Sequence, residues 1–333
     1  MSNNRTQHQL QPVLELRNVS VGYESAHGTV QAVRNISLKI YPNQIVGLIG
    51  ESGSGKSTLG NAIMNLLKNN AVLLGGEIIV QGQDVYKLNK KELRKFRWNR
   101  MSMVFQSAMN ALNPVLTVEQ QIADVYTSHR PNMTKKEIHD KAVELMRLVS
   151  IDPKHLRSYP HELSGGMRQR VVIAIAVALE PDLVIMDEPT TALDVVVQKS
   201  ILDKIKELQR VKGFAILFIS HDFSLVAELA ERVAIMYAGR LIEITNSGQL
   251  NLSERHHPYT EGLLRAIPEL TAETVKIEGI PGNPPDLINL PTGCAYHPRC
   301  KYAMESCKTV PPVERDVEGR LISCHLYAEE AVR

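Results

Sequence analysis

The amino-acid sequence predicts an α/β fold built around a parallel β-sheet. Three short apolar runs, residues 45–49, 183–186 and 215–219, are typical of strands that are covered on both faces. Between the last two runs, apolar residues recur at helical spacing: Val197, Ile201, Ile205 and Leu208. This alternation of buried strands with an amphipathic helix predicts right-handed strand–helix–strand connections, and therefore parallel strands.

The other elements follow from shorter patterns. Residues 13–49 alternate apolar and polar side chains before running into the first buried strand. A helix is expected over residues 57–67 and a strand pair around residues 76–80. From about residue 108 to residue 159 the pattern turns helical and amphipathic. We therefore expect a strand-rich N-terminal part, followed by a helical segment inserted before the second apolar strand.

The composition is that of a globular protein that does not itself span a membrane. Of the 333 residues, 44% are apolar and 22% are charged, and the net charge of +2 gives no reason to expect a nucleic-acid partner. The longest apolar run, residues 171–179, is far shorter than the roughly 20 residues that cross a bilayer, and predicts a buried helix. Residues 1–12 are polar, are expected to be flexible, and lack the apolar stretch of a secretory signal. We expect a chain that stays in the cytosol and reaches a membrane through a partner.

A phosphate-binding motif lies between the first predicted strand and the helix that follows it. Residues 50–57 match G-x-x-x-x-G-K-[ST], whose glycines let the backbone point several N–H groups at a phosphate. Lys56 is expected to contact the β- and γ-phosphates, and the Ser57 hydroxyl to bind Mg²⁺. The nucleotide-binding residues expected here are Gly50, Ser52, Gly53, Ser54, Gly55, Lys56, Ser57 and Thr58.

Two acidic residues and a histidine end the next two apolar strands. Asp187 and Glu188 directly follow residues 183–186, and the carboxyl ends of parallel strands are where open α/β sheets bind ligands. Asp187 is expected to hold Mg²⁺, and Glu188 to accept a proton from an attacking water. His221 ends the following strand and is expected at the same edge, within reach of a γ-phosphate. Together with the phosphate loop, these residues predict hydrolysis of a nucleoside triphosphate.

Four further motifs resemble those of the ATP-binding cassette (ABC) family. Residues 163–169, Leu-Ser-Gly-Gly-Met-Arg-Gln, resemble the family signature LSGGQ, with Met167 in place of the usual glutamine. Gln106 is similar to the Q-loop glutamine, and residues 191–194 resemble the D-loop. Tyr23 stands where the family stacks an aromatic ring on adenine.

The resemblance covers about residues 13–250 and implies both a fold and a second subunit. The implied fold is a RecA-like P-loop NTPase core with an antiparallel β subdomain and a helical subdomain at about residues 107–165. Two cassettes are implied to pair head-to-tail, so that signature and D-loop residues of one close over ATP held by the other: Ser164, Gly165, Gly166 and Asp194. The implied catalytic residues are Glu188, His221 and Gln106, and the implied Mg²⁺ ligands are Ser57, Gln106 and Asp187.

The C-terminal part carries a second resemblance. Closely spaced prolines after about residue 250 predict a separate, loop-rich appendage over residues 251–333. Within it, residues 255–260 and the pair Leu263 and Leu264 resemble the C-terminal extension of oligopeptide and dipeptide transporter ATPases. That subfamily also includes nickel and oligosaccharide importers, so the solute stays open.

The subfamily implies a bacterial importer at the cytoplasmic face of the inner membrane. Its implied partners are a second, paralogous cassette, two transmembrane permease subunits and a solute-binding protein. An exporter ATPase and a cytosolic ABC ATPase that acts on DNA or the ribosome are the alternatives. The cytosolic class is disfavoured because the segment between Lys56 and Ser164 is too short for the long coiled coil of the DNA-repair members.

All four cysteines lie in the C-terminal part: Cys294, Cys300, Cys307 and Cys324. Clustered thiols in a reducing compartment favour metal binding over disulfides. Four thiolates suit either a 4Fe–4S cluster or tetrahedral zinc. The resemblance implies a 4Fe–4S cluster, which we favour over zinc and over no metal. Such a cluster would staple a proline-rich tail that has few apolar residues of its own.

Overall fold

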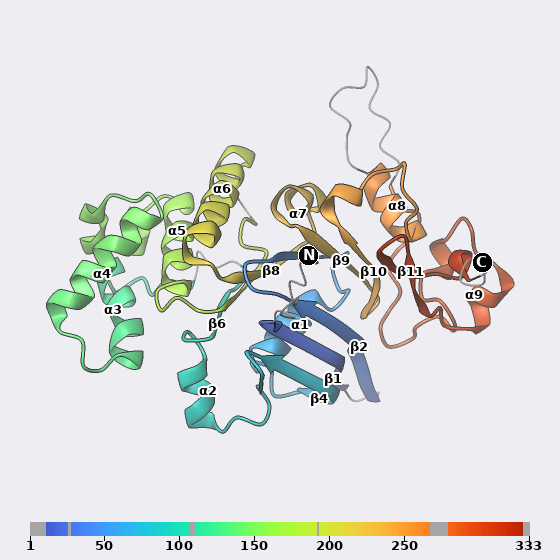
Figure 1. Cartoon of the computed structure of the whole chain (residues 1–333), viewed down its shortest axis with the longest axis horizontal. Coiled ribbons are helices and arrows are strands. Elements are labelled where there is room, and N and C mark those ends of the chain that lie inside the picture. Colours follow the sequence, from blue (N-terminus) through green and yellow to red (C-terminus); the bar gives the residue numbers. More distant parts are fainter. Residues whose placement is uncertain (1–10, 26–27, 107–110, 192, 267–278, 329–333) are drawn as a thin grey trace, which may run out of the picture.

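The computed structural model describes residues 11–25, 28–106, 111–191, 193–266 and 279–328 (Figure 1). It confirms the α/β class, with one sheet of eight strands and one of four. Of the N-terminal segment that was expected to be flexible, only residues 11 and 12 are described. Among the described helices, none is long and apolar enough to cross a membrane.

The larger sheet contains the three strands predicted from apolar runs. Its strands are, in spatial order, β11 (Glu314–Val317), β12 (Arg320–Ser323), β10 (Arg240–Asn246), β9 (Arg232–Tyr237), β3 (Ile45–Ile49), β8 (Ala215–Ser220), β7 (Leu183–Asp187) and β6 (Met101–Val104). The five strands from β9 to β6 are parallel, and those from β10 to β11 run antiparallel to their neighbours. Every residue of β3, β7 and β8 is buried, as expected of strands covered on both faces.

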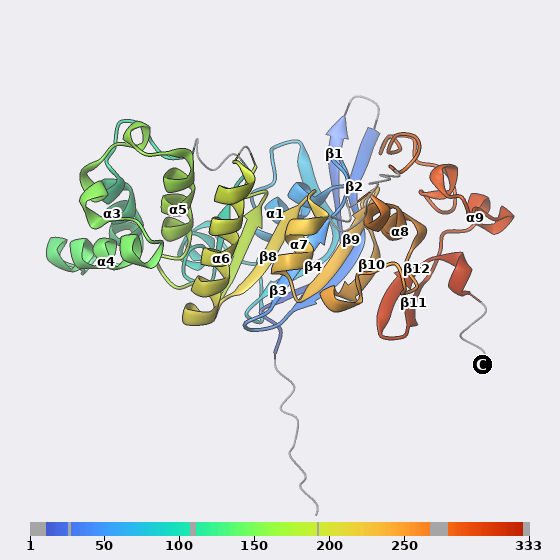
Figure 2. The same ribbon diagram turned by 90° about the horizontal axis from the view of Figure 1, so that it is seen from above.

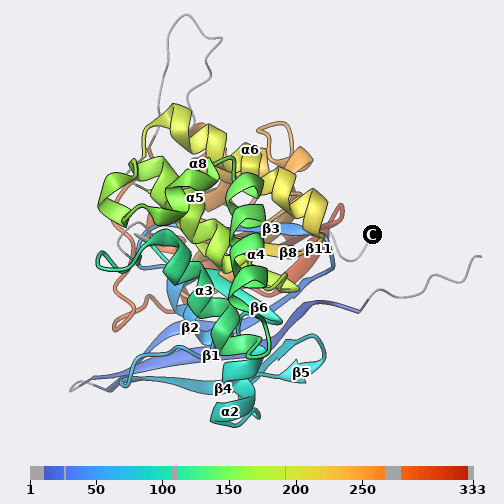
Figure 3. The same ribbon diagram turned by 90° about the vertical axis from the view of Figure 1, so that its left-hand side faces the viewer.

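The smaller sheet is antiparallel and packs on one face of the larger one. Its strands are, in spatial order, β2 (Gly28–Ile40), β1 (Leu14–Ser25), β4 (Ala71–Val80) and β5 (Gln83–Asp84). Helix α1 (Lys56–Ile63) contacts β1, β2 and β7, so it lies between the two sheets. It ends four residues earlier than predicted, because the chain turns at Asn65, which has a positive φ of 51°. Figure 3 shows this sheet and the long helices on opposite sides of the larger sheet.

Most helices lie on the side of the larger sheet that is opposite the smaller sheet. They are α3 (Val118–His129), α4 (Lys135–Leu148), α5 (Gly165–Ala176), α6 (Val195–Lys212) and α7 (Phe223–Leu229), while the short α2 (Lys90–Phe96) precedes β6. Thr117 and Thr134 begin α3 and α4 with complete capping boxes, which the sequence specifies through Gln120 and Glu137. Helices α3 and α4 lie within the segment expected to be a helical subdomain, at one end of the molecule (Figure 2).

The C-terminal part continues the larger sheet, whereas the sequence led us to expect a separate, loop-rich appendage. Strand β12 pairs with β10, with Ile322 opposite Glu243. The segment that forms β11 and β12 contains no proline, and its tight turn is made by Glu318 and Gly319, both at positive φ. Helices α8 (Pro258–Arg265) and α9 (Glu305–Thr309) complete this part. We call residues 251–328 the C-terminal extension.

Buried polar contacts join the extension to β10. The Glu243 carboxylate is fully buried; it pairs with the His256 ring at 2.6 Å and accepts a hydrogen bond from the His257 N–H at 2.8 Å. The Arg320 guanidinium is 0% exposed and pairs with Glu254 and Glu318. The Glu243 contacts thus hold the extension on β10, whereas the Arg320 pairs join segments within the extension.

Candidate functional site

The phosphate loop, residues 50–55, connects β3 to α1 and packs closely against the backbone of β2 and β9. A Cβ atom added to Gly50 would lie 2.3 Å from the Met236 carbonyl oxygen, and one added to Gly55 would lie 2.1 Å from the Ala32 carbonyl oxygen. Gly55 also has a φ of +99°. Both positions therefore require glycine, for close approach and, at Gly55, for conformation as well. The loop is held in one shape by strands β2 and β9.

Lys56 begins α1 and its side chain lies over the loop. The ammonium donates hydrogen bonds to the carbonyl oxygens of Gly50 and Glu51, at 2.7 and 2.9 Å. Burial lowers the pKa of Lys56, while the nearby carboxylates of Glu188 and Asp187 act in the opposite direction. The loop thus presents a partly desolvated cation beside backbone N–H groups, which suits a phosphate chain.

Asp187 and Ser57 meet at the carboxyl edge of the sheet. The Ser57 hydroxyl donates a hydrogen bond to the Asp187 carboxylate at 3.1 Å, and Asp187 is only 3% exposed. Burial raises the pKa of Asp187, and the hydrogen bond from Ser57 partly offsets that rise. A hydroxyl and a carboxylate oxygen side by side form the hard donor set that Mg²⁺ prefers, so these residues fit the ion.

Glu188 is the centre of a hydrogen-bond network that includes both other predicted catalytic residues. Its carboxylate accepts hydrogen bonds from the Gln106 amide at 3.0 Å and the Thr191 hydroxyl at 3.1 Å, and contacts His221 Nδ1 at 2.9 Å. Burial raises the pKa of Glu188, but the contacts with His221 and Thr191 outweigh it and leave the pKa below its usual value. The structure therefore brings together three residues that are far apart in the sequence.

Glu188 also has an unusual backbone conformation. Its φ is +48°, in the left-handed region that residues other than glycine rarely occupy. Such strain at a strand end is found where function fixes the direction of a side chain. Here it turns the carboxylate away from the continuing strand direction and toward His221. The sequence did not reveal this feature.

The signature and D-loop residues begin two helices on the exposed side of the helical layer. Ser164 caps α5 by accepting a hydrogen bond from the Met167 N–H, and Asp194 caps α6 by accepting one from the Val197 N–H. Within the described part of the chain, no hydrogen bond joins these residues to the phosphate loop. Ala192 of the predicted D-loop lies outside the described residues.

The chain resembles known proteins in both of its parts. Residues 33–191 match the ABC transporter family, and residues 242–307 match the C-terminal region of oligopeptide/dipeptide transporters. The chain is 40% identical to a dipeptide transport ATP-binding protein of Caldanaerobacter subterraneus, covering 95% of this chain and 98% of the relative. It is 41% identical to an oligopeptide transport ATP-binding protein of Escherichia coli, with 97% and 96% covered.

The chain belongs to the ABC transporter family. A dimeric ATP-binding cassette in a post-hydrolysis state, bound to ADP and phosphate, superposes with a TM-score of 0.63 at 29% identity, over 70% of this chain and 98% of the other. A cassette of a Clostridium perfringens ABC transporter complex superposes with a TM-score of 0.61 at 27% identity, over 71% and 89%. These neighbours confirm the predicted P-loop cassette fold and the ATPase class.

The aromatic residue that the resemblance places on adenine, Tyr23, lies beside the phosphate loop. The Tyr23 hydroxyl shares a hydrogen bond with the Thr58 hydroxyl at 3.0 Å, which ties the ring to the start of α1. Tyr23 lines a pocket of about 450 Å³ beside the phosphate loop. Residues 284–288 of the C-terminal extension line the same pocket. The extension therefore reaches the nucleotide side of the ABC core, which the sequence did not indicate.

The extension also contacts the phosphate loop directly, through Glu51. Arg299 forms a two-pronged ion pair with the Glu51 carboxylate at 2.7 and 2.9 Å, and its side chain is only 6% exposed. The Tyr259 hydroxyl accepts a hydrogen bond from the Glu51 N–H at 3.0 Å. This ion pair raises the pKa of Arg299 further above its ordinary value. Glu51 is a variable position of the motif, so only the spatial neighbours identify its role.

The four cysteines do not form a metal site in the structure. All four are free thiols, and the described residues contain no group of three or more metal-binding side chains placed to hold an ion. The predicted 4Fe–4S cluster therefore gains no support here. Burial raises the pKa of Cys324 to about 12, and the other three thiols, which lie within electrostatic reach, add to that rise.

The Glu51–Arg299 ion pair yields a testable prediction. Arg299→Ala leaves Glu51 without its partner, so we expect the KM for ATP to rise severalfold and the free energy of unfolding to fall by about 2 kcal/mol or more. A double-mutant cycle with Glu51→Ala, followed by urea unfolding and ATPase kinetics, measures the coupling. The control is Lys308→Ala, which breaks an exposed ion pair with Glu305 in the same extension. Equal effects of both variants would contradict the prediction.

Proposed function

We propose that this chain powers the uptake of peptides into a bacterial cell, as one of two ATP-hydrolysing cassettes bound to a transmembrane permease. The observation that carries the proposal is the coexistence of a hydrogen-bonded Glu188, Gln106 and His221 with a C-terminal region of the oligopeptide/dipeptide transporter type. The relatives that cover nearly the whole chain are named as dipeptide and oligopeptide transport proteins. Nickel or an oligosaccharide is the alternative solute, because importers of these solutes belong to the subfamily that the C-terminal part resembles.

A second cassette completes the site in this proposal. Ser164 is exposed at the start of α5, and Val195 and Val196 at the start of α6 are 78% and 79% exposed. Two adjacent exposed valines at the start of a helix favour a surface that a protein partner covers. Ser164, Gly165, Gly166 and Asp194 would then face ATP bound by the partner's phosphate loop. A paralogous second cassette and a solute-binding protein complete the proposed system.

The chemical roles follow from the geometry on each side of the nucleotide. The residues at positions 50–58 bind the phosphate chain, with Lys56 supplying the positive charge. Ser57, Asp187 and Gln106 would hold Mg²⁺, which neutralises phosphate charge when it is bound. Glu188, whose lowered pKa keeps it ionised at neutral pH, accepts the proton of the attacking water, and His221 orients the Glu188 carboxylate.

A groove for the permease lies next to Gln106. A pocket of about 410 Å³ is lined by Phe105, the segment 111–113 and residues of α3 and α5. Phe105 is half-exposed there, directly before the glutamine that contacts Glu188. We infer that a cytoplasmic helix of the permease binds in this groove, which would place the chain at the cytoplasmic face of the inner membrane. Residues 107–110, which follow Gln106 in the chain and were also expected to contribute to such a groove, lie outside the described residues.

We retain the 4Fe–4S cluster as a proposal on the strength of its donor set. Neighbouring thiols of the group contribute to the raised pKa values of Cys294, Cys300 and Cys324, so the four lie near one another. Cys294 and Cys307 are joined through their backbones by a hydrogen bond of 2.8 Å. When bound, a cluster would add cross-links between loops that contain few apolar residues.

The catalytic role of Glu188 predicts the effect of Glu188→Gln. The amide has a similar shape and retains one acceptor oxygen but cannot accept a proton, so we expect ATP turnover to fall by about 10²–10⁴-fold with ATP binding retained. The assay uses the assembled transporter, with the hydrolytic site of the other cassette inactivated. Glu207→Gln, at an exposed position on α6, serves as the control. Unchanged turnover in Glu188→Gln would refute the assignment.

The position of Gln106 between Glu188 and the groove predicts the effect of Gln106→Ala. We expect ATP affinity to change by less than about threefold, while solute uptake per ATP hydrolysed falls at least about tenfold, because the nucleotide site and the groove lose their connection. Uptake of a labelled tripeptide into vesicles, measured together with phosphate release, gives this ratio. Gln83→Ala on β5 is the control. Normal uptake by the Gln106 variant would rule out the coupling role.

The cluster proposal is tested on the full chain purified without oxygen. We expect iron and acid-labile sulfide, with broad absorbance near ~400 nm, and loss of both in Cys324→Ser. Ser306→Ala, which changes a neighbouring hydroxyl and no thiol, is the control. Zinc in place of iron, or protein free of metal, would each count against the cluster.

A further inference from the structure

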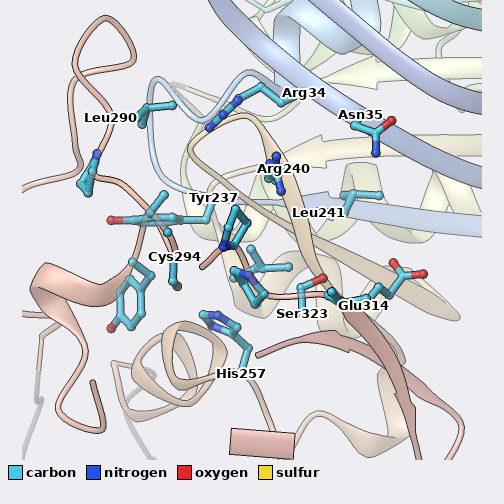
Figure 4. Close-up of a pocket in the computed structure, with 18 of the residues that line it drawn as sticks. Arg34, Asn35, Tyr237, Arg240, Leu241, His257, Leu290, Cys294, Glu314 and Ser323 are labelled. Carbon is cyan, nitrogen blue, oxygen red and sulfur yellow. The ribbon is translucent and has the colours of Figure 1, made fainter. Parts of the chain in front are cut away.

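A second pocket lies between the ABC core and the C-terminal extension, apart from the nucleotide site. Its volume is about 540 Å³. The smaller sheet contributes Arg34 to its wall, the end of β9 contributes Tyr237, and the start of β10 contributes Arg240 (Figure 4). The extension contributes residues 290–296. It shares only Tyr237 with the pocket beside the phosphate loop. Neither the predicted ATP site nor the permease groove includes it.

Two arginines face this pocket without acidic partners. The side chains of Arg34 and Arg240 make no hydrogen bond or ion pair within the described part of the chain, and Arg240 Nε is buried with no partner at all. Burial lowers the pKa of Arg34, and the positive charge of Arg240 lowers it further. The Arg34 N–H donates a hydrogen bond to the carbonyl oxygen of Gly239 at 2.7 Å, which holds the backbone of Arg34 beside that of Arg240. Figure 4 shows them side by side on one wall of the pocket.

This arrangement is unlike that of the other buried arginines. Arg299 and Arg320, whose side chains are almost fully buried, each pair with a carboxylate. Placing two partly buried like charges together costs free energy, and a buried Nε–H without an acceptor adds to that cost. An unsatisfied buried donor at a cavity, beside a second arginine without an acidic partner, favours a site whose ligand supplies the missing acceptors.

The remaining wall limits what that ligand can be. Burial lowers the pKa of His257 to about 3, so this histidine is neutral and adds no charge. Glu314 is the one carboxylate among the lining residues, and its own pKa is raised by burial. Leu290 and Tyr296 supply apolar surface beside the arginines. The pocket therefore combines an excess of positive charge with an apolar area.

We propose that this pocket binds a small organic phosphate, with its phosphate group on Arg34 and Arg240 and its organic part against Leu290 and Tyr296. Two adjacent guanidinium groups match the double charge and the several acceptor oxygens of a phosphate ester. A volume of about 540 Å³ is within the usual range of small-molecule sites and is larger than a free phosphate ion would fill. Because its walls come from both parts of the chain, an occupied pocket would tie the extension to the ABC core.

The test uses phenyl phosphate and inorganic phosphate as probes, titrated calorimetrically into the full chain. Saturating ADP with Mg²⁺ keeps both probes out of the phosphate loop. We expect phenyl phosphate to bind, and to bind more tightly than inorganic phosphate. Arg34→Gln/Arg240→Gln should weaken phenyl phosphate at least about tenfold, since each lost charged hydrogen bond contributes a factor of this size. The matched control is Arg147→Gln/Arg210→Gln, which removes the same charge from exposed positions on α4 and α6.

A second variant covers the case in which the double substitution disturbs folding. Asn35 lines the pocket, is exposed, and has a positive φ that aspartate also tolerates. Asn35→Asp keeps both arginines and adds a repelling charge, so it should weaken phenyl phosphate and leave the melting temperature nearly unchanged. Equal affinity in the pocket and control variants would overturn the proposal. Equal binding of both probes would reduce the site to one for free phosphate and exclude the organic ligand.

Discussion

The close contact between the phosphate loop and the backbone of two neighbouring strands is the constraint on which the rest of the structure depends. Gly50 and Gly55 lie so close to the carbonyl oxygens of Met236 and Ala32 that no side chain fits at either position. This contact fixes the loop relative to both sheets at once, because Ala32 belongs to the smaller sheet and Met236 to the larger one. The direction of Lys56, and the position of α1 between the sheets, follow from it.

The sequence was sufficient for the core of the fold because local patterns and tertiary structure agree there. Buried parallel strands read as continuous apolar runs, and the chemistry at their carboxyl ends, Asp187, Glu188 and His221, follows each run directly in the chain. Neighbouring residues in the sequence were therefore enough to predict which side chains meet at the edge of the sheet. The meeting of Gln106 with Glu188 at 3.0 Å could be expected only through the family resemblance, since the two residues follow different strands, β6 and β7.

What the sequence did not reveal depends on contacts between distant segments. Glu51 occupies a position that the motif leaves free, and its partner Arg299 lies in a part of the chain that prolines led us to treat as separate. Prolines restrict the backbone only near their own positions. They therefore give no information on the proline-free hairpin, β11 and β12, that pairs with the larger sheet. The positive φ of Glu188 likewise could not be predicted from the residue type, because the surrounding structure imposes it.

The pairing of β12 with β10 has a consequence for the solubility of the folded chain. Strand β10 carries Ile242 and Ile244, which are 8% and 4% exposed, and without β12 its backbone N–H and C=O groups would form an open template for strands of other molecules. The outermost strand is instead β11, which is four residues long and carries Glu314, Arg315 and Asp316. A short, charged border of this kind resists edge-to-edge aggregation. The hairpin thus protects the sheet in addition to extending it.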